Sequence, residues 1–184
     1  YPYYSRAAFY QWERLEFEQA ISEYPGATEL DPQWAKPYHG RGLSYWATDR
    51  GQKALADLDK AIEVDDHFAE AYETRGFVHS NLGNTEQALK DYGKAIEVDP
   101  ESAEWYLSRG WQYYDLSEYE KAAADFNKAV EFAPEDEDAH AFRARTLVEL
   151  GQYQQAIADF ARAVELAREH DRDYDECDWL RRRA

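Results

Sequence analysis

The residues with the clearest capacity for chemistry form an acidic run, DRDYDECD, over residues 171–178. Three alternate carboxylates have the spacing of the first ligands of an EF-hand calcium loop: Asp171, Asp173 and Asp175. That loop needs Gly at its sixth position and Glu at its twelfth, where this chain has Glu176 and Arg182. The run is therefore not an EF-hand. An adventitious metal site that includes His170 and Cys177 is a weaker alternative, because no pair of these ligands has a strong spacing.

The five histidines do not suggest a catalytic or metal-binding arrangement. They occupy unrelated positions in the repeating pattern described below: His39, His67, His79, His140 and His170. None adjoins a Ser or Cys in a nucleophile motif, and no glycine-rich phosphate loop occurs. We therefore predict a protein that is not an enzyme and that uses no cofactor and no metal. Catalysis would need domains outside this chain.

Composition and charge restrict the classes of partner. Hydrophobic residues make up 44% of the chain and aromatic residues 16%, which is enough to bury a core. The formal net charge of −17 disfavours duplex nucleic acid and anionic membrane surfaces, since both need cationic contacts. The basic run at residues 181–183 is too short to reverse this field. We expect a basic or neutral partner, no nucleic acid and no membrane insertion.

The sequence says little about the compartment. The single cysteine excludes an internal disulfide, and no apolar run approaches the length of a membrane span. We expect a soluble protein, with a cytoplasmic location favoured. The chain starts with Tyr rather than Met, which favours an excised fragment or a processed form.

The sequence repeats every 34 residues. Successive frames begin at Tyr1, Ala35, Ala69, Ala103 and Glu137, with a remnant from Asp171. Small residues recur at the eighth, twentieth and twenty-seventh positions of every frame. Small residues that recur in this way mark places where two helices approach too closely for a larger side chain.

Each frame is predicted to form two helices. Large apolar residues between the small ones, such as Leu89, Tyr92 and Ile96, follow helical spacing rather than strand alternation. Breaks fall in the middle of frames, at residues 81–84, 115–118 and 149–152. Prolines close several frames, because proline cannot continue a helix: Pro32, Pro100 and Pro134. Each helix should have about 14 residues and a length of about 21 Å.

This pattern resembles that of tetratricopeptide repeat proteins over residues 1–170. The fourth frame reproduces the family's order of aromatic, small, Tyr, Ala, aromatic, Ala and Pro: Tyr106, Gly110, Tyr113, Ala122, Phe126, Ala129 and Pro134. The resemblance implies an all-α, right-handed solenoid of five helix-turn-helix repeats. Their expected bounds are 1–34, 35–68, 69–102, 103–136 and 137–170. One departure is arginine where the family often has leucine: Arg41, Arg75, Arg109 and Arg143.

Residues 171–184 are expected to form a polar capping helix behind the last repeat. In this interpretation Tyr174 and Cys177, with Trp179 or Leu180, cover the apolar face that the last repeat exposes. Arg168 stands where earlier frames close with proline, so the last helix can continue directly into this segment.

Two helix-breaking residues interrupt the pattern in the first repeat. Pro25 and Gly26 fall in the middle of its second helix, where they cost about 3 and about 1 kcal/mol relative to Ala. Their counterparts in other frames face solvent, so we expect an intact core with a kink or early break near Tyr24. Sequence drift in a terminal repeat is favoured over a functional hinge as the explanation.

Aspartates recur sixteen residues after the four arginines: Asp57, Asp91, Asp125 and Asp159. Both sets skip the first frame, which suggests a contact between the two helices of a repeat or between adjacent repeats. Solvated surface charges are the alternative.

The resemblance also implies where a partner binds. In tetratricopeptide arrays the first helix of each repeat lines a concave face. The corresponding positions here form an aromatic floor with acidic walls: Phe9, Trp12, Lys36, His39, Leu43, Trp46, Glu70, Glu73, Phe77, Asn81, Glu104, Leu107, Trp111, Tyr114, Asp115, Asp138, Arg145, Val148 and Glu149. Exposed aromatics anchor peptides, and acidic walls attract Lys or Arg. Binding is favoured over mutual packing for Phe77 and Trp111, whereas the two interpretations are even for Trp12 and Trp46.

The clamp by which some related domains hold EEVD-type acidic tails of heat-shock chaperones is absent. It uses Lys, Asn, Asn, Lys and Arg, where this chain has His39, Leu43, Thr74, Glu104 and Ser108. We therefore predict a non-catalytic protein-interaction scaffold that binds a peptide or helical segment with apolar anchors and basic residues. Self-association into homo-oligomers is the alternative function.

Overall fold

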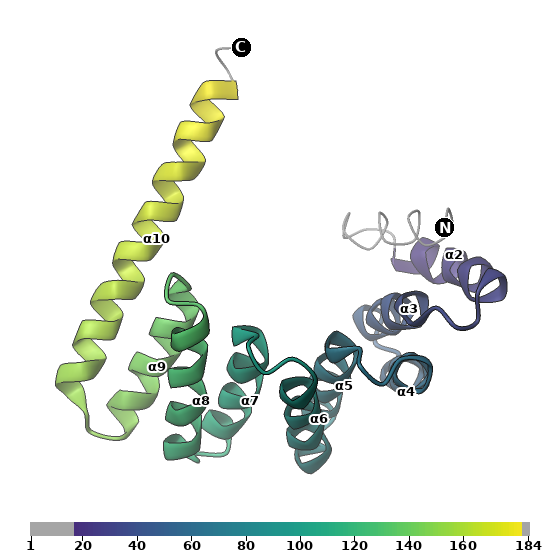
Figure 1. Ribbon diagram of the computed structural model, residues 1–184, viewed down its shortest axis with the longest axis horizontal. Coiled ribbons are helices and arrows are strands. Elements are labelled where there is room, and N and C mark those ends of the chain that lie inside the picture. The colour runs from purple at the N-terminus through teal and green to yellow at the C-terminus, as the bar shows by residue number, and fades with distance from the viewer. Residues whose placement is uncertain (1–16, 182–184) are drawn as a thin grey trace. The chain divides into compact units, whose positions relative to one another are not determined.

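The computed structural model describes the backbone of residues 17–181 and the side chains of residues 17–169. This part of the chain contains nine α-helices and no strand (Figure 1). The helices are α2 Phe17–Leu30, α3 Ala35–Ala47, α4 Gly51–Val64, α5 Ala69–Asn81, α6 Thr85–Val98, α7 Ala103–Asp115, α8 Tyr119–Phe132, α9 Glu137–Glu149 and α10 Tyr153–Arg181. The predicted all-α fold is confirmed.

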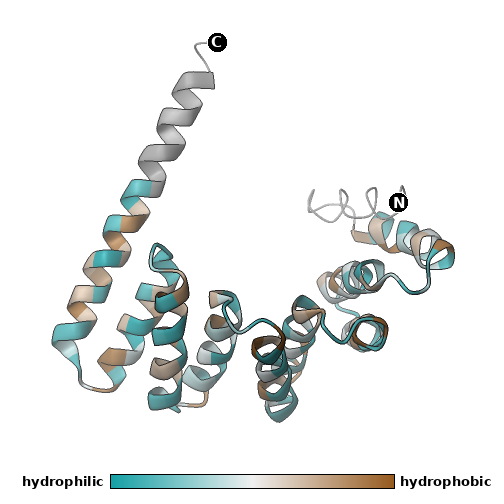
Figure 2. Ribbon diagram, viewed as in Figure 1, coloured by the Kyte–Doolittle hydropathy of each residue, from teal (hydrophilic) through white to brown (hydrophobic). Residues whose placement is uncertain are grey.

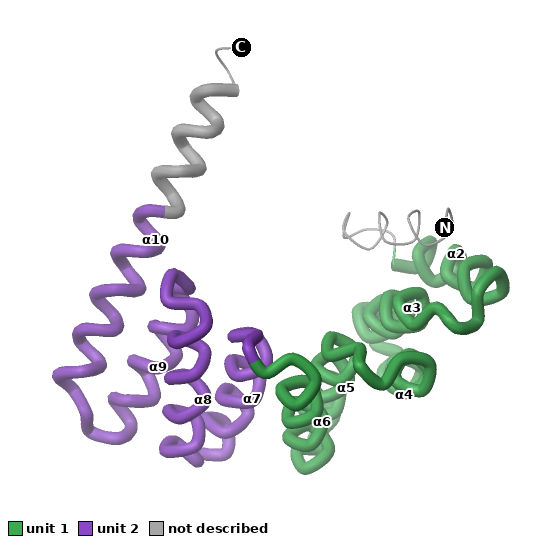
Figure 3. The backbone as a smooth tube through the Cα atoms, in the orientation of Figure 1, with its two compact units in different colours: residues 1–100 green, residues 101–184 purple. Residues whose placement is uncertain are grey.

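The chain divides into two compact units, residues 1–100 and 101–184 (Figure 3). In unit 1, α2 packs on α3, and each helix from α3 to α5 packs on the one that follows it. In unit 2, α7 packs on α8, α8 on α9, and α9 on α10. The first helices of neighbouring frames also touch within each unit, α3 with α5 and α7 with α9.

The turn between paired helices depends on one residue with a left-handed backbone. This residue has a φ of 60° at Asp49, 79° at Gly83, 59° at Ser117 and 72° at Gly151. All four occupy the fifteenth position of their frames. Glycine adopts this conformation without a steric penalty, whereas Asp and Ser adopt it at some cost. The predicted mid-frame breaks are confirmed at Gly83, Ser117 and Gly151, and Asp49 marks a further turn of the same kind.

Close approach of paired helices explains the small residues of the eighth frame position. A methyl group on Gly76 would lie 2.9 Å from the ring of Tyr92, and one on Gly110 would lie 2.8 Å from the ring of Phe126. The same contact joins Gly42 to Leu58, at 3.0 Å. The large residue of the second helix therefore packs directly on the backbone of the first, as the sequence predicted.

Ion pairs also join the two helices of a repeat. Arg109 donates from Nε and Nη2 to the two carboxylate oxygens of Asp125, both at 2.8 Å. The same fork joins three further pairs: Arg41 with Asp57, Arg75 with Asp91, and Arg143 with Asp159. The four aspartates are buried, so the predicted contact between helices is confirmed and the interpretation as solvated surface charge is wrong.

Two of these arginines also reach the preceding frame. Arg75 Nη1 donates to Asp59 at 2.7 Å, and Arg143 Nη1 donates to Asn127 at 3.1 Å. The guanidinium suits this double role because it presents donors in several fixed directions.

The predicted early break near Tyr24 is wrong, because α2 continues without interruption through Pro25 to Leu30. Tyr24 is buried, and its ring fills the space beside Gly40, where a methyl group would lie 2.3 Å from Tyr24 Oη. Burying a side chain of this size stabilises by about 1.5–3 kcal/mol, which offsets much of the proline's cost of about 3 kcal/mol. Tertiary packing therefore holds the helix together across Pro25.

Helix α10 continues past Arg168 to Arg181, as expected from the missing proline. It has 29 residues, whereas the other second helices have 14. Hydrophobic residues recur along its described part (Figure 2). The capping role of residues 171–184 stays a prediction, because their side chains lie outside the described residues. None of the described helices is both long and apolar enough to cross a membrane.

Candidate functional site

The predicted binding residues fall into two groups, one in each unit. The unit 1 face consists of residues from α3 and α5: Lys36, His39, Leu43, Trp46, Glu70, Glu73, Phe77 and Asn81. The unit 2 face consists of residues from α7 and α9: Glu104, Leu107, Trp111, Tyr114, Asp115, Asp138, Arg145, Val148 and Glu149. Phe9 and Trp12 lie outside the described residues.

An aromatic pair lies at the centre of the unit 1 face. The rings of Trp46 on α3 and Phe77 on α5 meet edge to face, with centroids 5.9 Å apart. Phe77 is 43% exposed, whereas Trp46 is half-buried. The two rings therefore stabilise each other and still offer apolar surface, so mutual packing and partner binding are compatible here.

His39 contributes a neutral polar group to the unit 1 face. Its Nε2 lies 2.9 Å from Thr74 Oγ1, and its ring meets Phe68 edge to face at 5.1 Å. Burial lowers the pKa of His39 to about 4, against the opposing effect of a hydrogen bond to the backbone of Glu70. The imidazole is therefore uncharged at neutral pH and does not repel a cationic ligand.

The polar edge of the unit 1 face is only partly acidic. Glu70 is exposed, and Lys36 on α3 is exposed as well. Asn81 Nδ2 donates to the carbonyl of Phe77 at 2.8 Å, so this amide is engaged with its own helix. Negative charge on this face comes from Glu70 and the half-buried Glu73.

A larger aromatic cluster carries a cation in unit 2. Trp111 and Tyr114 stack almost in parallel, with centroids 5.4 Å apart and an interplanar angle of 9°. The guanidinium of Arg145 lies 5.3 Å from the centroid of Trp111 and 5.8 Å from that of Tyr114. The π faces of this pair are therefore already in contact with a positive charge from α9.

Phe142 belongs to this cluster but was not among the predicted residues. Its ring centroid lies 5.0 Å from that of Trp111 and 5.8 Å from that of Phe126. Phe142 thus connects the half-buried cluster to the core. It lies three residues before Arg145 on α9, and this helical spacing could have identified it.

The unit 2 face also carries four acidic residues. Glu104, Asp115, Asp138 and Glu149 are all exposed. Partial burial raises the pKa of Asp138, and the nearby Asp136 and Glu137 act in the same direction. The carboxylates therefore give α7 and α9 of this face exposed negative charge.

The described histidines do not form a catalytic group. His140 replaces the tyrosine that other frames have at its position, and its Nε2 lies 3.0 Å from the carbonyl of Pro134. Its Nδ1 lies 3.4 Å from Asp159, which is already paired with Arg143. These contacts give His140 a structural role.

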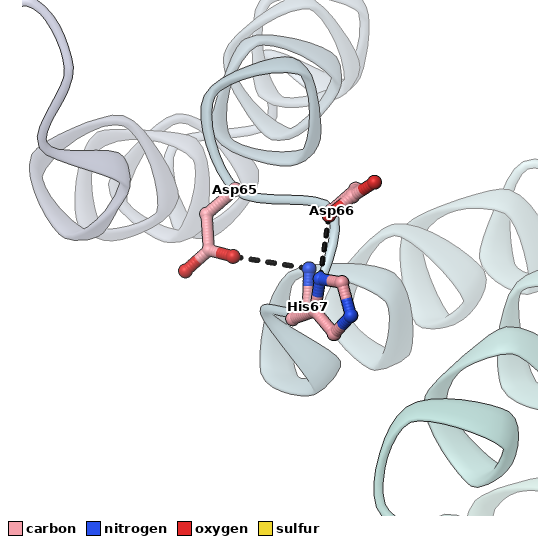
Figure 4. Close-up of side chains that lie close together, drawn as sticks. All are labelled: Asp65, Asp66 and His67. Atoms are coloured by element: carbon pink, nitrogen blue, oxygen red, sulfur yellow. Dashed lines mark hydrogen bonds and ion pairs between the residues drawn. The ribbon is translucent and has the colours of Figure 1, made fainter.

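One exposed group of possible metal ligands lies in the turn between α4 and α5 (Figure 4). Asp65 Oδ1 accepts a hydrogen bond from the backbone of His67 at 3.0 Å, and His67 Nδ1 lies 2.6 Å from Asp66 Oδ1. Asp31 makes the same turn contact with Gln33, at 3.1 Å. The arrangement is therefore a recurring turn that precedes a helix, and it does not by itself indicate a metal site.

A cavity of about 560 Å³ lies between α8, α9 and α10. Its charged lining residues include Arg143 and Asp159, which neutralise each other in the ion pair described above. The cavity does not include residues of the unit 2 face.

Comparison with solved structures shows a shared fold. MamA matches with a TM-score of 0.75 and 22% identity, over 85% of this chain and 92% of MamA. PilF from Pseudomonas aeruginosa matches with a TM-score of 0.80 and 20% identity, over 94% of this chain and 85% of PilF. YrrB, described as a tetratricopeptide protein with an unusual peptide-binding site, matches with a TM-score of 0.68 and 22% identity, over 92% of this chain and 87% of YrrB.

Sequence comparison gives the family. No curated protein sequence matches the chain significantly. Two models of the tetratricopeptide repeat match residues 74–137 and residues 137–170, which include α6, α7, α8 and α9 in full. These matches agree with the paired helices, the small-to-large contacts and the turns of the structure. The chain belongs to the tetratricopeptide repeat family.

Proposed function

We propose that this protein is a non-catalytic scaffold that binds a peptide or helical segment on the unit 1 face. Tetratricopeptide repeat proteins typically bind proteins or peptides and do not catalyse reactions. The observation that carries the proposal is the exposed ring of Phe77, held in place by Trp46. A rigid aromatic side chain with exposed surface is a typical anchor point, because little entropy is lost when a ligand packs on it.

The ligand should present an apolar side chain to Phe77 and a basic side chain to Glu70. The neutral His39 and the net charge of −17 favour the approach of such a segment. Because Lys36 shares this face, one or two basic residues suit it better than a long basic run.

The unit 2 face should bind basic segments more weakly. Arg145 covers the rings of Trp111 and Tyr114, so a ligand cation has to displace it before it reaches the same π surface. An apolar or aromatic side chain can instead pack at the edge of the cluster without removing the arginine.

Binding to an array of short peptides that vary in apolar residues and net charge tests the proposal. Phe77→Ala should weaken the binding of the best peptides about tenfold, which corresponds to the loss of one anchor. Leu30→Ala is the matched control, because Leu30 is 62% exposed in the same unit but lies on α2. Equal binding by the wild type and Phe77→Ala would contradict the proposal.

Self-association is the second candidate function. Four exposed apolar side chains on one face of α10 favour it: Tyr153, Ile157, Phe160 and Val164. An exposed apolar patch of this kind is typical of a surface that binds another protein.

A further inference from the structure

The apolar side chains of α10 form a continuous stripe. Tyr153 is 63% exposed, Ile157 68%, Phe160 38% and Val164 50%. Their spacing of four, three and four residues places them on one side of the helix. We call these four residues the α10 stripe.

The position of Phe160 in the α10 stripe is covered in the equivalent helices of each unit. Phe160 corresponds to Leu58 of α4 and Phe126 of α8, and both of these are fully buried. Leu58 packs with Val78 of the following helix α5, and Phe126 contacts Phe142 of the following helix α9. The α10 stripe thus has the chemistry of a surface that a helix covers, yet it is exposed.

The charged residues of this part of α10 do not interrupt the stripe. Asp159 is buried and pairs with Arg143 of α9. Arg162 lies on the opposite side of the helix and pairs with Glu165 at 2.8 Å. Gln154 and Ala161 border the stripe on its outer side and are uncharged, and the exposed Arg168, one turn beyond Val164 on that side, is cationic. A second chain can therefore approach here despite the net charge of −17.

The spacing of the stripe is the same when it is read in either direction. If two copies of α10 lie antiparallel, Tyr153 faces Val164 of the second copy and Ile157 faces its Phe160. In each pair an aromatic ring thus meets a smaller aliphatic side chain. Each pair forms twice, once on either side of a two-fold axis. No acidic side chain of the stripe or its outer border then faces another.

We propose that the α10 stripe is a dimer interface that packs against the same stripe of a second copy of the chain, in antiparallel orientation. This inference rests on the second candidate function, self-association. It is independent of peptide binding on the unit 1 face.

The molar mass of the full chain in solution, measured by sedimentation equilibrium from low to high micromolar concentration, tests the inference. The wild type should approach twice the chain mass of 21.5 kDa, and Ile157→Glu should remain at the single mass with unchanged helicity. Leu30→Glu is the matched control and should leave the dimer intact, since Leu30 is similarly exposed but lies on α2.

The other outcomes separate the inference from self-association in general. A wild type that stays monomeric overturns both. A dimer that survives Ile157→Glu overturns the α10 interface and leaves self-association by another surface. A mass that keeps rising beyond the dimer overturns the closed two-fold arrangement.

A charge exchange tests the antiparallel orientation. Tyr153→Lys and Val164→Glu should each weaken the dimer, and mixing the two variants should restore it, because these positions face each other across the interface. Mixing would give no restoration if the helices packed in parallel, and that result would overturn the proposed geometry.

Discussion

At the scale of single residues, the recurring arginines and aspartates join the two helices of each repeat that contains them. Each arginine that replaces the family's leucine is joined to an aspartate of the second helix by two hydrogen bonds. The sixteen-residue spacing, together with the absence of both partners from the first frame, was enough to predict the contact. The hydrogen bond from Arg75 to Asp59 could not be predicted, because aspartate does not recur at the position of Asp59 in the other frames.

A double-mutant cycle on Arg109 and Asp125 tests the contribution of this fork. Arg109→Ala leaves a buried carboxylate without its cation, and we expect a loss of about 3 kcal/mol in the free energy of unfolding in urea. Arg109→Ala/Asp125→Ala should lose less than the sum of the single variants, with a coupling of about 1–3 kcal/mol. Additive losses would mean that the pair does not link the helices energetically.

The buried His39 should make stability depend on pH. Its pKa is lowered to about 4 in the folded chain, from an ordinary value near 6.5. Below pH 6.5 the unfolded chain binds a proton that the folded chain does not, so stability is lost as the pH falls toward 4, by up to about 3 kcal/mol. Above pH 6.5 this contribution is fully present.

Urea unfolding at pH 7 and at pH 4.5 measures this effect. His39→Gln should lose less stability between the two pH values than the wild type does, because the amide does not titrate. The difference between the two chains removes the contribution of the other titratable groups. An identical loss in both would show that His39 titrates normally.

At the scale of elements, periodicity predicted the helices and their turns, and local propensity failed at α2. The small residues of the eighth frame position pack against the large residue sixteen positions later, so the repeat itself encodes the helix pair. In α2 a proline predicted a break, but the buried Tyr24 beside Gly40 keeps the helix continuous. A contact between helices cannot be deduced from the propensity of one residue.

Replacing Pro25 should therefore stabilise the protein. Pro25→Ala restores a backbone N–H inside α2 and removes a steric clash, and we expect a gain of about 3 kcal/mol in the free energy of unfolding. Thermal or urea unfolding measures it. A variant that is no more stable than the wild type would show that the surrounding packing already accommodates the ring at no cost.

At the scale of the whole molecule, the sequence identified the fold class and the family but only part of the candidate site. The frame positions located Trp46, Phe77 and Trp111, because the first helix of every frame follows the same pattern. They did not reveal that Arg145 covers Trp111 and Tyr114, which depends on the side-chain conformation of an exposed arginine. The stripe on α10 was foreseen only as an apolar face that a cap would cover.

These observations give the molecule two distinct kinds of surface. The unit 1 face has an exposed aromatic anchor beside carboxylates, and it suits a ligand with apolar and basic side chains. The α10 stripe is apolar, and the spacing of its residues is the same in either direction along the helix. It suits a second copy of the chain. We therefore expect substitutions in α5 to alter ligand binding and substitutions in α10 to alter self-association.

The most direct test of the proposed function is an NMR titration of the isotope-labelled chain with the peptide that binds best on the array. The side-chain N–H of Trp46 reports on the unit 1 face, and that of Trp105, which is buried on α7, serves as an internal reference. We predict shifts at Trp46 and along the amides of α3 and α5, and their loss in Phe77→Ala. Saturable shifts confined to α4 and α6, with Trp46 unchanged, would contradict the account.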